Sequence, residues 1–91
     1  MLAMLCRNRV KDFQRWKDVF DSHEEAHRRA GLRLVHLWQA VEEPNEVFFL
    51  FEVDDLDLAL AFTSAPEAAE AGRASGVLDG ELHFLRSVNG A

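Results

Sequence analysis

The sequence contains one cysteine, no tyrosine and only two prolines in 91 residues. A lone thiol cannot form an internal disulfide, which excludes a disulfide-stapled secreted domain. The apolar start, Met1–Cys6, is too short for the core of a signal peptide or for a membrane span. With 48% hydrophobic residues and five glycines, the composition also differs from that of disordered and collagen-like chains. We therefore expect one folded domain, residues 1–91, in the reducing environment of the cytoplasm.

Positive charge is scarce as well. Ten lysines and arginines stand against sixteen aspartates and glutamates, which gives a formal net charge of -6. Such a field repels phosphate backbones and anionic lipid headgroups. We therefore expect neither a nucleic acid nor a membrane as a partner.

Four segments have the pattern of β-strands. Residues 1–6 and 46–53 are apolar on both alternating faces, which is typical of central strands covered on both sides. Residues 32–41 and 81–88 are half polar, which favours the edges of a sheet. We expect the first strand to break after Cys6, and Asp79–Gly80 to form a turn before the last strand.

Two helical regions separate these strands. The first is predicted over about residues 13–30, with Asp12 as its N-cap and Gly31 at its end. Its apolar face repeats at steps of three and four residues through Phe13, Trp16, Phe20, His23 and His27. In the second region Asp55 is expected to cap residues 56–63. The capping-box spacing Ser64-x-x-Glu67 predicts that a further helix starts there and continues to about Gly76.

The resulting order, β-α-β-β-α-β, predicts an α+β fold of the ferredoxin-like kind, with a four-stranded antiparallel sheet and the first and third strands at its centre. Both helical regions then cover one face. The other face, roughly 350 Å² in plan, has nothing in the chain to cover it and is as large as the apolar patches that monomers usually expose. We therefore predict a homodimer that pairs sheet to sheet, and leave further pairing of dimers open.

Several short motifs resemble those of a known superfamily. The matching segments are Asp12-Phe13-x-x-Trp16-x-x-x-Phe20-Asp21-x-His23, Ala30-Gly31-Leu32, Glu43-Pro44-Asn45-Glu46-Val47, Asp54-Asp55-Leu56, Ala61-Phe62-x-Ser64-x-Pro66 and Gly76-Val77. Together they cover nearly the whole chain, which resembles the small dimeric α/β-barrel proteins of the antibiotic-biosynthesis-monooxygenase-like superfamily. The resemblance implies ferredoxin-like subunits paired into a barrel, with a small-molecule cavity between helices and sheet.

The catalytic residues of this superfamily match the sequence less well than its structural motifs do. Its cofactor-independent oxygenases combine asparagine, tryptophan, arginine and tyrosine in the cavity, and this chain has no tyrosine. Its haem-degrading members use an asparagine, a tryptophan and a histidine. Asn8 is placed like that asparagine, but residues 52–54 hold no tryptophan and residues 66–75 no histidine. We accordingly predict no cofactor.

One motif points to a different class of protein. His23-Glu24-Glu25-Ala26-His27 matches the His-Glu-x-x-His pattern of zinc hydrolases, in which two imidazoles one helical turn apart bind the metal. Both histidines, however, continue the apolar stripe that begins at Phe13, so this face should lie on the chain's own sheet. We therefore predict no metal site and keep the zinc-dependent hydrolase as an alternative.

The residues expected to line a ligand pocket are Trp16, His36, Trp38 and Phe62, with His23 as the catalytic proton acceptor. Alternation along residues 32–41 places His36 and Trp38 on one side of the strand, together with Leu32. Cys6 is expected to be a buried, unreactive thiol. The predicted function is binding of a small apolar molecule, with an activity like that of a cofactor-independent oxygenase or isomerase. The alternative is a non-enzymatic module for self-association or partner binding.

Overall fold

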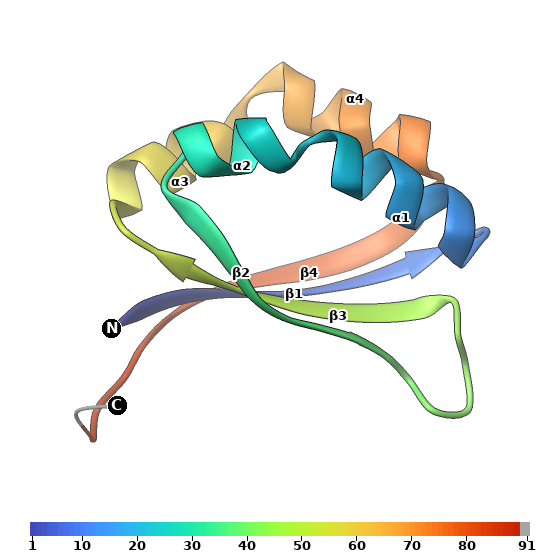
Figure 1. Ribbon diagram of the computed structural model, residues 1–91, viewed down its shortest axis with the longest axis horizontal. Helices are drawn as coiled ribbons and strands as arrows, with labels where there is room; N and C mark the ends of the chain where they lie inside the picture. Colours follow the sequence, from blue (N-terminus) through green and yellow to red (C-terminus); the bar gives the residue numbers. More distant parts are fainter. Residues whose placement is uncertain (90–91) are drawn as a thin grey trace.

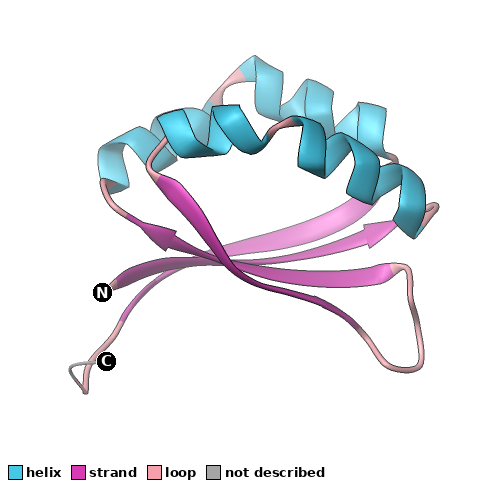
Figure 2. Ribbon diagram, viewed as in Figure 1, coloured by secondary structure: helices cyan, strands magenta, loops and turns pink. Residues whose placement is uncertain are grey.

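The structure, a computed structural model, describes residues 1–89 (Figures 1 and 2). Its elements are β1 (Leu2–Val10), α1 (Phe13–Ser22), α2 (Glu24–Arg29), β2 (Leu32–Gln39), β3 (Glu46–Val53), α3 (Leu56–Ser64), α4 (Pro66–Ser75) and β4 (Val77–Arg86). The strands form one antiparallel sheet in the order β2-β3-β1-β4. All the helices lie on the same face of this sheet (Figure 1). The predicted ferredoxin-like α+β fold, with the first and third strands at the centre, is therefore confirmed.

Local capping signals account for most of the helix boundaries. The carboxylate of Asp12 accepts a hydrogen bond from the backbone N–H of Arg15 at 2.9 Å, and Asp55 accepts one from Leu58 at 3.1 Å. Gly76 follows α4 in the left-handed conformation, with φ of 80°. Such short carboxylates satisfy free N–H groups of the first turn, and glycine tolerates positive φ at a helix end. These predicted boundaries are confirmed.

The first helical region differs from the prediction because it breaks at His23 into α1 and α2. The backbone N–H of His23 bonds to the carbonyl of Phe20 at 3.1 Å, one residue short of the α-helical partner. The carbonyl of Val19 instead accepts from the Ser22 hydroxyl at 2.6 Å and lies 2.8 Å from Nδ1 of His23. Side chains therefore replace the backbone bond that the break removes.

The predicted capping box at Ser64 is wrong. Ser64 is the last residue of α3, and Ala65 precedes α4 without any side-chain cap. Pro66 occupies the first turn of α4, and Ala65 is extended, with φ of -71° and ψ of 147°. A proline disfavours the helical conformation in the residue before it but is well tolerated at the first helical position. The proline thus separates the two helices.

Two strands are longer than the sequence pattern indicates. β1 continues through Arg7-Asn8-Arg9, and β4 begins at Val77, so that Gly80 pairs with Asn8 instead of forming a turn. Arg7 donates to Glu46 on β3 at 2.7 Å and to Glu81 on β4 at 2.8 Å. Opposite charges on neighbouring strands support the pairing, so this polar stretch continues the strand instead of ending it.

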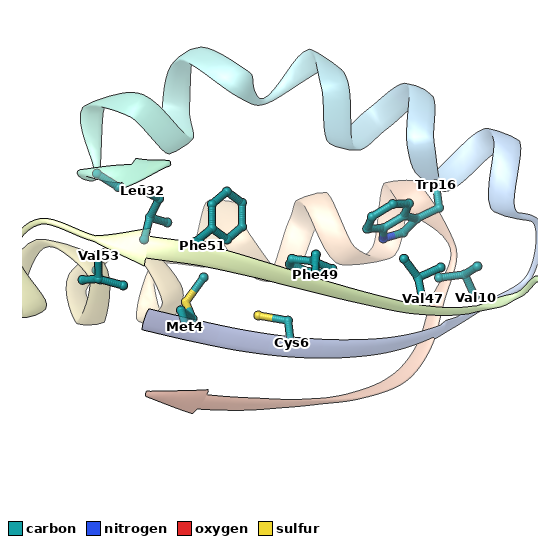
Figure 3. Packing of buried hydrophobic residues seen from close by; sticks show 11 residues of the cluster. Met4, Cys6, Val10, Trp16, Leu32, Val47, Phe49, Phe51 and Val53 are labelled. Carbon is teal, nitrogen blue, oxygen red and sulfur yellow. The ribbon is translucent and has the colours of Figure 1, made fainter. Parts of the chain in front are cut away.

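The core lies between the helices and the helix-facing side of the sheet (Figure 3). Alternate residues of β3 are buried, and β1 contributes Met4 and Cys6, whose side chains lie on the helix-facing side of that strand in Figure 3. Within residues 1–89, no helix has the length and hydropathy that crossing a membrane would require.

Candidate functional site

A cavity of about 370 Å³ lies between the helices and the sheet. We call it the helix–sheet cavity. Its floor is formed by β1, β3 and β4, one wall by α1 and α2, and the other wall by the end of α3 and by α4. Its volume falls within the range of about 300–1,000 Å³ that is usual for small-molecule sites, and most of its lining is apolar.

Aromatic rings form much of the lining. Trp16 is 2% exposed and stacks on Phe20, with ring centroids 4.7 Å apart, and its ring lies 5.5 Å from that of Phe49. Phe62 faces the cavity from the end of α3. Of the side chains predicted from sequence, Trp16, His23 and Phe62 therefore lie together here.

His23 stands at the break between α1 and α2 and is half-buried in the cavity wall. Its Nδ1 lies 2.8 Å from the carbonyl oxygen of Val19. Because a carbonyl can only accept, this contact requires the hydrogen to be on Nδ1. In the neutral ring Nε2 then carries a lone pair. The helix break therefore selects the tautomer in which Nε2 can accept a proton or a hydrogen bond.

His27 lies one turn further along the chain and is surrounded by rings. Its centroid is 5.0 Å from Phe51, 5.1 Å from Phe20 and 5.6 Å from Phe62. Burial lowers the pKa of His27 below its ordinary 6.5, and the nearby His23 adds to the effect, while Glu24 opposes it. The side chain also lines a second hollow of about 520 Å³, beside β2. It therefore acts as an uncharged part of the wall.

This lowered pKa predicts a pH dependence of stability. In the unfolded chain His27 gains a proton as the pH falls through about 6.5, whereas in the folded protein it does so only at lower pH. The free energy of unfolding should therefore be fully retained above pH 6.5 and decrease below it. Urea unfolding of the wild type and of His27→Phe at pH 7.5 and pH 5.5 measures this. The variant should lose less stability between the two pH values, and an equal loss in both proteins would contradict the assignment.

Asn8, which lines the cavity, and its strand partner Gly80 were not predicted as site residues from the strand pattern. With its amide turned to satisfy both neighbours, Asn8 accepts from Nε1 of Trp16 at 3.3 Å and donates to the carbonyl of Arg7 at 3.0 Å. Gly80, its partner on β4, leaves room for this amide: a Cβ there would lie 2.6 Å from it. The available signal for Asn8 was the family resemblance, in which it is placed like the asparagine of the haem-degrading members. The pairing of Asn8 with a glycine far along the chain was not visible in the sequence.

Cys6 lies on the cavity floor and is 5% exposed. Burial raises the pKa of its thiol to about 12. Thiolates, not thiols, are the nucleophilic form of cysteine. The prediction of an unreactive buried thiol agrees with this environment.

His36 and Trp38 lie on the other side of the sheet. Their rings stack, with centroids 4.8 Å apart, so the prediction that they share one side of β2 is confirmed. However, the register shifts between Leu34 and His36, because Leu34 pairs with Phe51 and His36 with Leu50. The extra residue, Val35, forms a β-bulge that turns the following side chains to the opposite face. They therefore do not line the helix–sheet cavity.

The face without helices, here called the open face, carries an ion cluster at one end. Besides Glu46 and Glu81, Arg7 donates to Asp79 at 3.2 Å, and Nε of Arg9 donates to Asp79 at 2.8 Å. Hydrogen bonds from Arg9 and Arg7 lower the pKa of Asp79, and those from Arg7 and His83 lower the pKa of Glu81. These arginines are therefore paired within the chain.

The zinc-hydrolase motif has no complete ligand set. Among residues 1–89, no three histidine, cysteine, aspartate or glutamate side chains come close enough together to hold a metal ion. Glu24 of the motif binds Arg28 at 3.1 Å. His23 lies against the Val19 carbonyl and His27 among phenylalanine rings. Structural zinc needs four ligands and catalytic zinc three, so this geometry argues against the hydrolase alternative.

Comparison with known proteins identifies the fold but not a close relative. No protein-family model and no curated protein matches the sequence. Solved structures do match, over nearly the full length of both chains. An uncharacterised NIPSNAP domain protein from Burkholderia xenovorans has a TM-score of 0.70 and 16% identity, covering 100% of this chain and 98% of its own. A candidate antibiotic biosynthesis monooxygenase from Bordetella bronchiseptica has a TM-score of 0.77 and 14% identity, covering 96% of each.

A further similar structure is a candidate antibiotic biosynthesis monooxygenase from Deinococcus radiodurans, with a TM-score of 0.75 and 12% identity. It covers 100% of this chain and 96% of its own. The chain therefore has the ferredoxin-like fold of the antibiotic-biosynthesis-monooxygenase-like proteins. The resemblance seen in the sequence is confirmed at the level of the fold.

Proposed function

We propose that this protein binds a small, mostly apolar molecule in the helix–sheet cavity. The observation that carries the proposal is the cavity itself, about 370 Å³ with a mainly apolar lining. A module for self-association alone would be expected to fill the space between helices and sheet with side chains, because empty apolar volume costs stability. Several structural neighbours are named as antibiotic biosynthesis monooxygenases, which supports a small-molecule site in this fold.

We assign to His23 the role of accepting a hydrogen bond or a proton from the ligand. The basis is the contact between its Nδ1 and the Val19 carbonyl, which leaves the Nε2 lone pair free in the neutral ring. Trp16 and Phe62 supply flat apolar surfaces beside it. A general base aimed at an apolar ligand is the chemistry expected of an oxygenase or isomerase that uses no cofactor.

Replacing His23 by alanine is expected to weaken ligand binding about tenfold while the fold is retained, since one hydrogen bond is lost. The probe is 2-naphthol, and binding is followed by NMR through the indole N–H signals. Trp16 in the cavity should shift and Trp38 on the open face should not. His36→Ala is the matched control, because His36 lies on the open face, and its affinity should equal that of the wild type. An unshifted Trp16 signal in the wild type would contradict the proposed site.

We further propose that the protein is a homodimer that pairs through the open face. The two edge strands of this face, β2 and β4, carry Trp38 and Leu85, which are 45% and 44% exposed, and Arg7 and Arg9 on this face are already paired with carboxylates. The β2–β3 loop and the segment after β4 extend beyond the sheet on the side away from the helices (Figure 1). They carry Val41 and Val88, which are 99% and 88% exposed. A second copy would bury these apolar groups in a two-fold interface.

The Trp38→Glu variant tests this interface. A charge buried in a desolvated interface should convert a dimer at micromolar concentration into single chains, as measured by analytical ultracentrifugation. Leu58→Glu is the control, because Leu58 is 49% exposed but lies on α3, away from the open face. A wild-type protein that sediments as a single chain at micromolar concentration would refute the dimer.

A further inference from the structure

The hydrogen-bond donors of the helix–sheet cavity are largely used within the protein. The hydroxyl of Thr63 donates to the carbonyl of Leu60 at 3.2 Å. The hydroxyl of Ser75, which is 5% exposed, donates to the carbonyl of Gly72 at 3.1 Å. Each hydroxyl has a single hydrogen, so what these two side chains have left for a ligand is oxygen lone pairs.

The ring donors are used in the same way. The Nδ1–H group of His23 donates to the Val19 carbonyl, so the lone pair of Nε2 in the neutral ring remains available to a ligand. Nε1–H of Trp16 donates to the Asn8 amide, which in turn donates to the carbonyl of Arg7. The remaining donors are uncharged: one N–H group on Asn8, one on neutral His27 and the weak S–H donor of Cys6. Acceptors therefore predominate among the groups that remain free for a ligand.

The charged groups around the cavity also disfavour an anionic ligand. None of the described residues in its lining is a lysine or an arginine, and the one carboxylate there is that of Glu67, at the exposed start of α4. A bound carboxylate or phosphate would find no cation to replace its lost hydration. Moving an uncompensated anion out of water is costly, whereas an O–H or N–H group could pair with the available lone pairs.

We infer that the helix–sheet cavity selects a flat, apolar molecule that carries an O–H or N–H donor, and excludes the corresponding carboxylate or phosphate. This inference rests on the proposed small-molecule site and adds which hydrogen-bonding group and which charge its ligand can carry. It follows from which hydrogen atoms the protein uses internally, because free acceptors lie on both sides of the cavity: His23 at the α1–α2 break, and Thr63 and Ser75 on the opposite wall.

Three ligands with the same ring system test the inference at pH 8, where imidazoles are ordinarily neutral. They are 2-naphthol, which has a donor, 2-methoxynaphthalene, which has only an acceptor, and 2-naphthoate, which is an anion. Kd is measured from the shift of the Trp16 indole signal, with Trp38 as the internal control. The naphthol should bind about three- to tenfold more tightly than the ether, the value of one hydrogen bond. The naphthoate should not shift Trp16 measurably.

Two variants locate the effect. His23→Ala should bring the affinity for the naphthol to that for the ether, because the acceptor is gone. Glu67→Lys places a cation at the edge of the cavity and should make binding of 2-naphthoate measurable. If the ether or the naphthoate binds the wild type as tightly as the naphthol, the inference is overturned while the proposed site stands. If none of the three ligands shifts Trp16, the proposed site itself is refuted.

Discussion

Replacement of Trp16 by alanine is expected to lower the free energy of unfolding by about 3–5 kcal/mol, the usual cost of deleting a buried aromatic side chain. Trp16 is 2% exposed and packs against Phe20 and Phe49, which joins α1 to β3. Its loss would enlarge a cavity that already exists. We expect that the neighbouring rings cannot repack to fill the added volume. It would also leave the Asn8 amide without the indole N–H that it accepts from.

The matched control is Trp38→Ala, which removes the same side chain from the open face, where it is 45% exposed. Urea unfolding of dilute protein, followed by circular dichroism, measures both variants. Trp38→Ala should lose less than half as much stability as Trp16→Ala. Equal losses would mean that Trp16 does not have the central place in the core that the structure assigns to it.

Gly80→Ala is expected to destabilise the protein by about 1–3 kcal/mol, although alanine is ordinarily a better residue than glycine in regular structure. A Cβ at position 80 would lie 2.7 Å from the backbone carbonyl oxygen of Arg7 and 2.6 Å from the end of the Asn8 side chain. The amide could rotate away, but the carbonyl is part of β1 and is held by the sheet. The variant should therefore also displace Asn8 and shift the indole N–H signal of Trp16.

Gly72→Ala provides the matched comparison. Gly72 is in the middle of α4, and a Cβ there meets no atom within 4 Å. In that position alanine should raise the free energy of unfolding by about 0.5–1 kcal/mol, because it restricts the unfolded chain more than glycine does. The two glycine substitutions are thus expected to have opposite signs. A stabilising Gly80→Ala would contradict the close approach of β4 to β1 at this position.

The candidate site was only partly predictable from sequence. The helical repeat that contains Trp16 and His23 placed both on the sheet-facing side of the helix, and both line the cavity. For β2 the same reasoning failed: alternation assigned His36 to the side of Leu32, but the bulge at Val35 reverses the face. A bulge depends on how two strands pair, and no residue type within β2 specifies it.

The boundaries show the same division. Asp12 and Asp55 were recognisable as caps because a cap involves residues only three positions apart. The extension of β1 beyond Cys6 was not recognisable, since the partners of Arg7 are Glu46 and Glu81, far away in the sequence. The charges that were interpreted as the end of a strand are in fact cross-strand pairs.

The sequence by itself determined the order of helices and strands, the two central strands and the face of α1 that turns inwards. These follow from periodicity and capping, which act over a few residues. Only the tertiary structure decided that a cavity remains above the sheet, that Asn8 meets Trp16 over a glycine, and that the free groups of this cavity are mainly hydrogen-bond acceptors. Those properties depend on which residues that are distant in the sequence come into contact and which hydrogen bonds they form. Both are decided only when the helices and strands pack together.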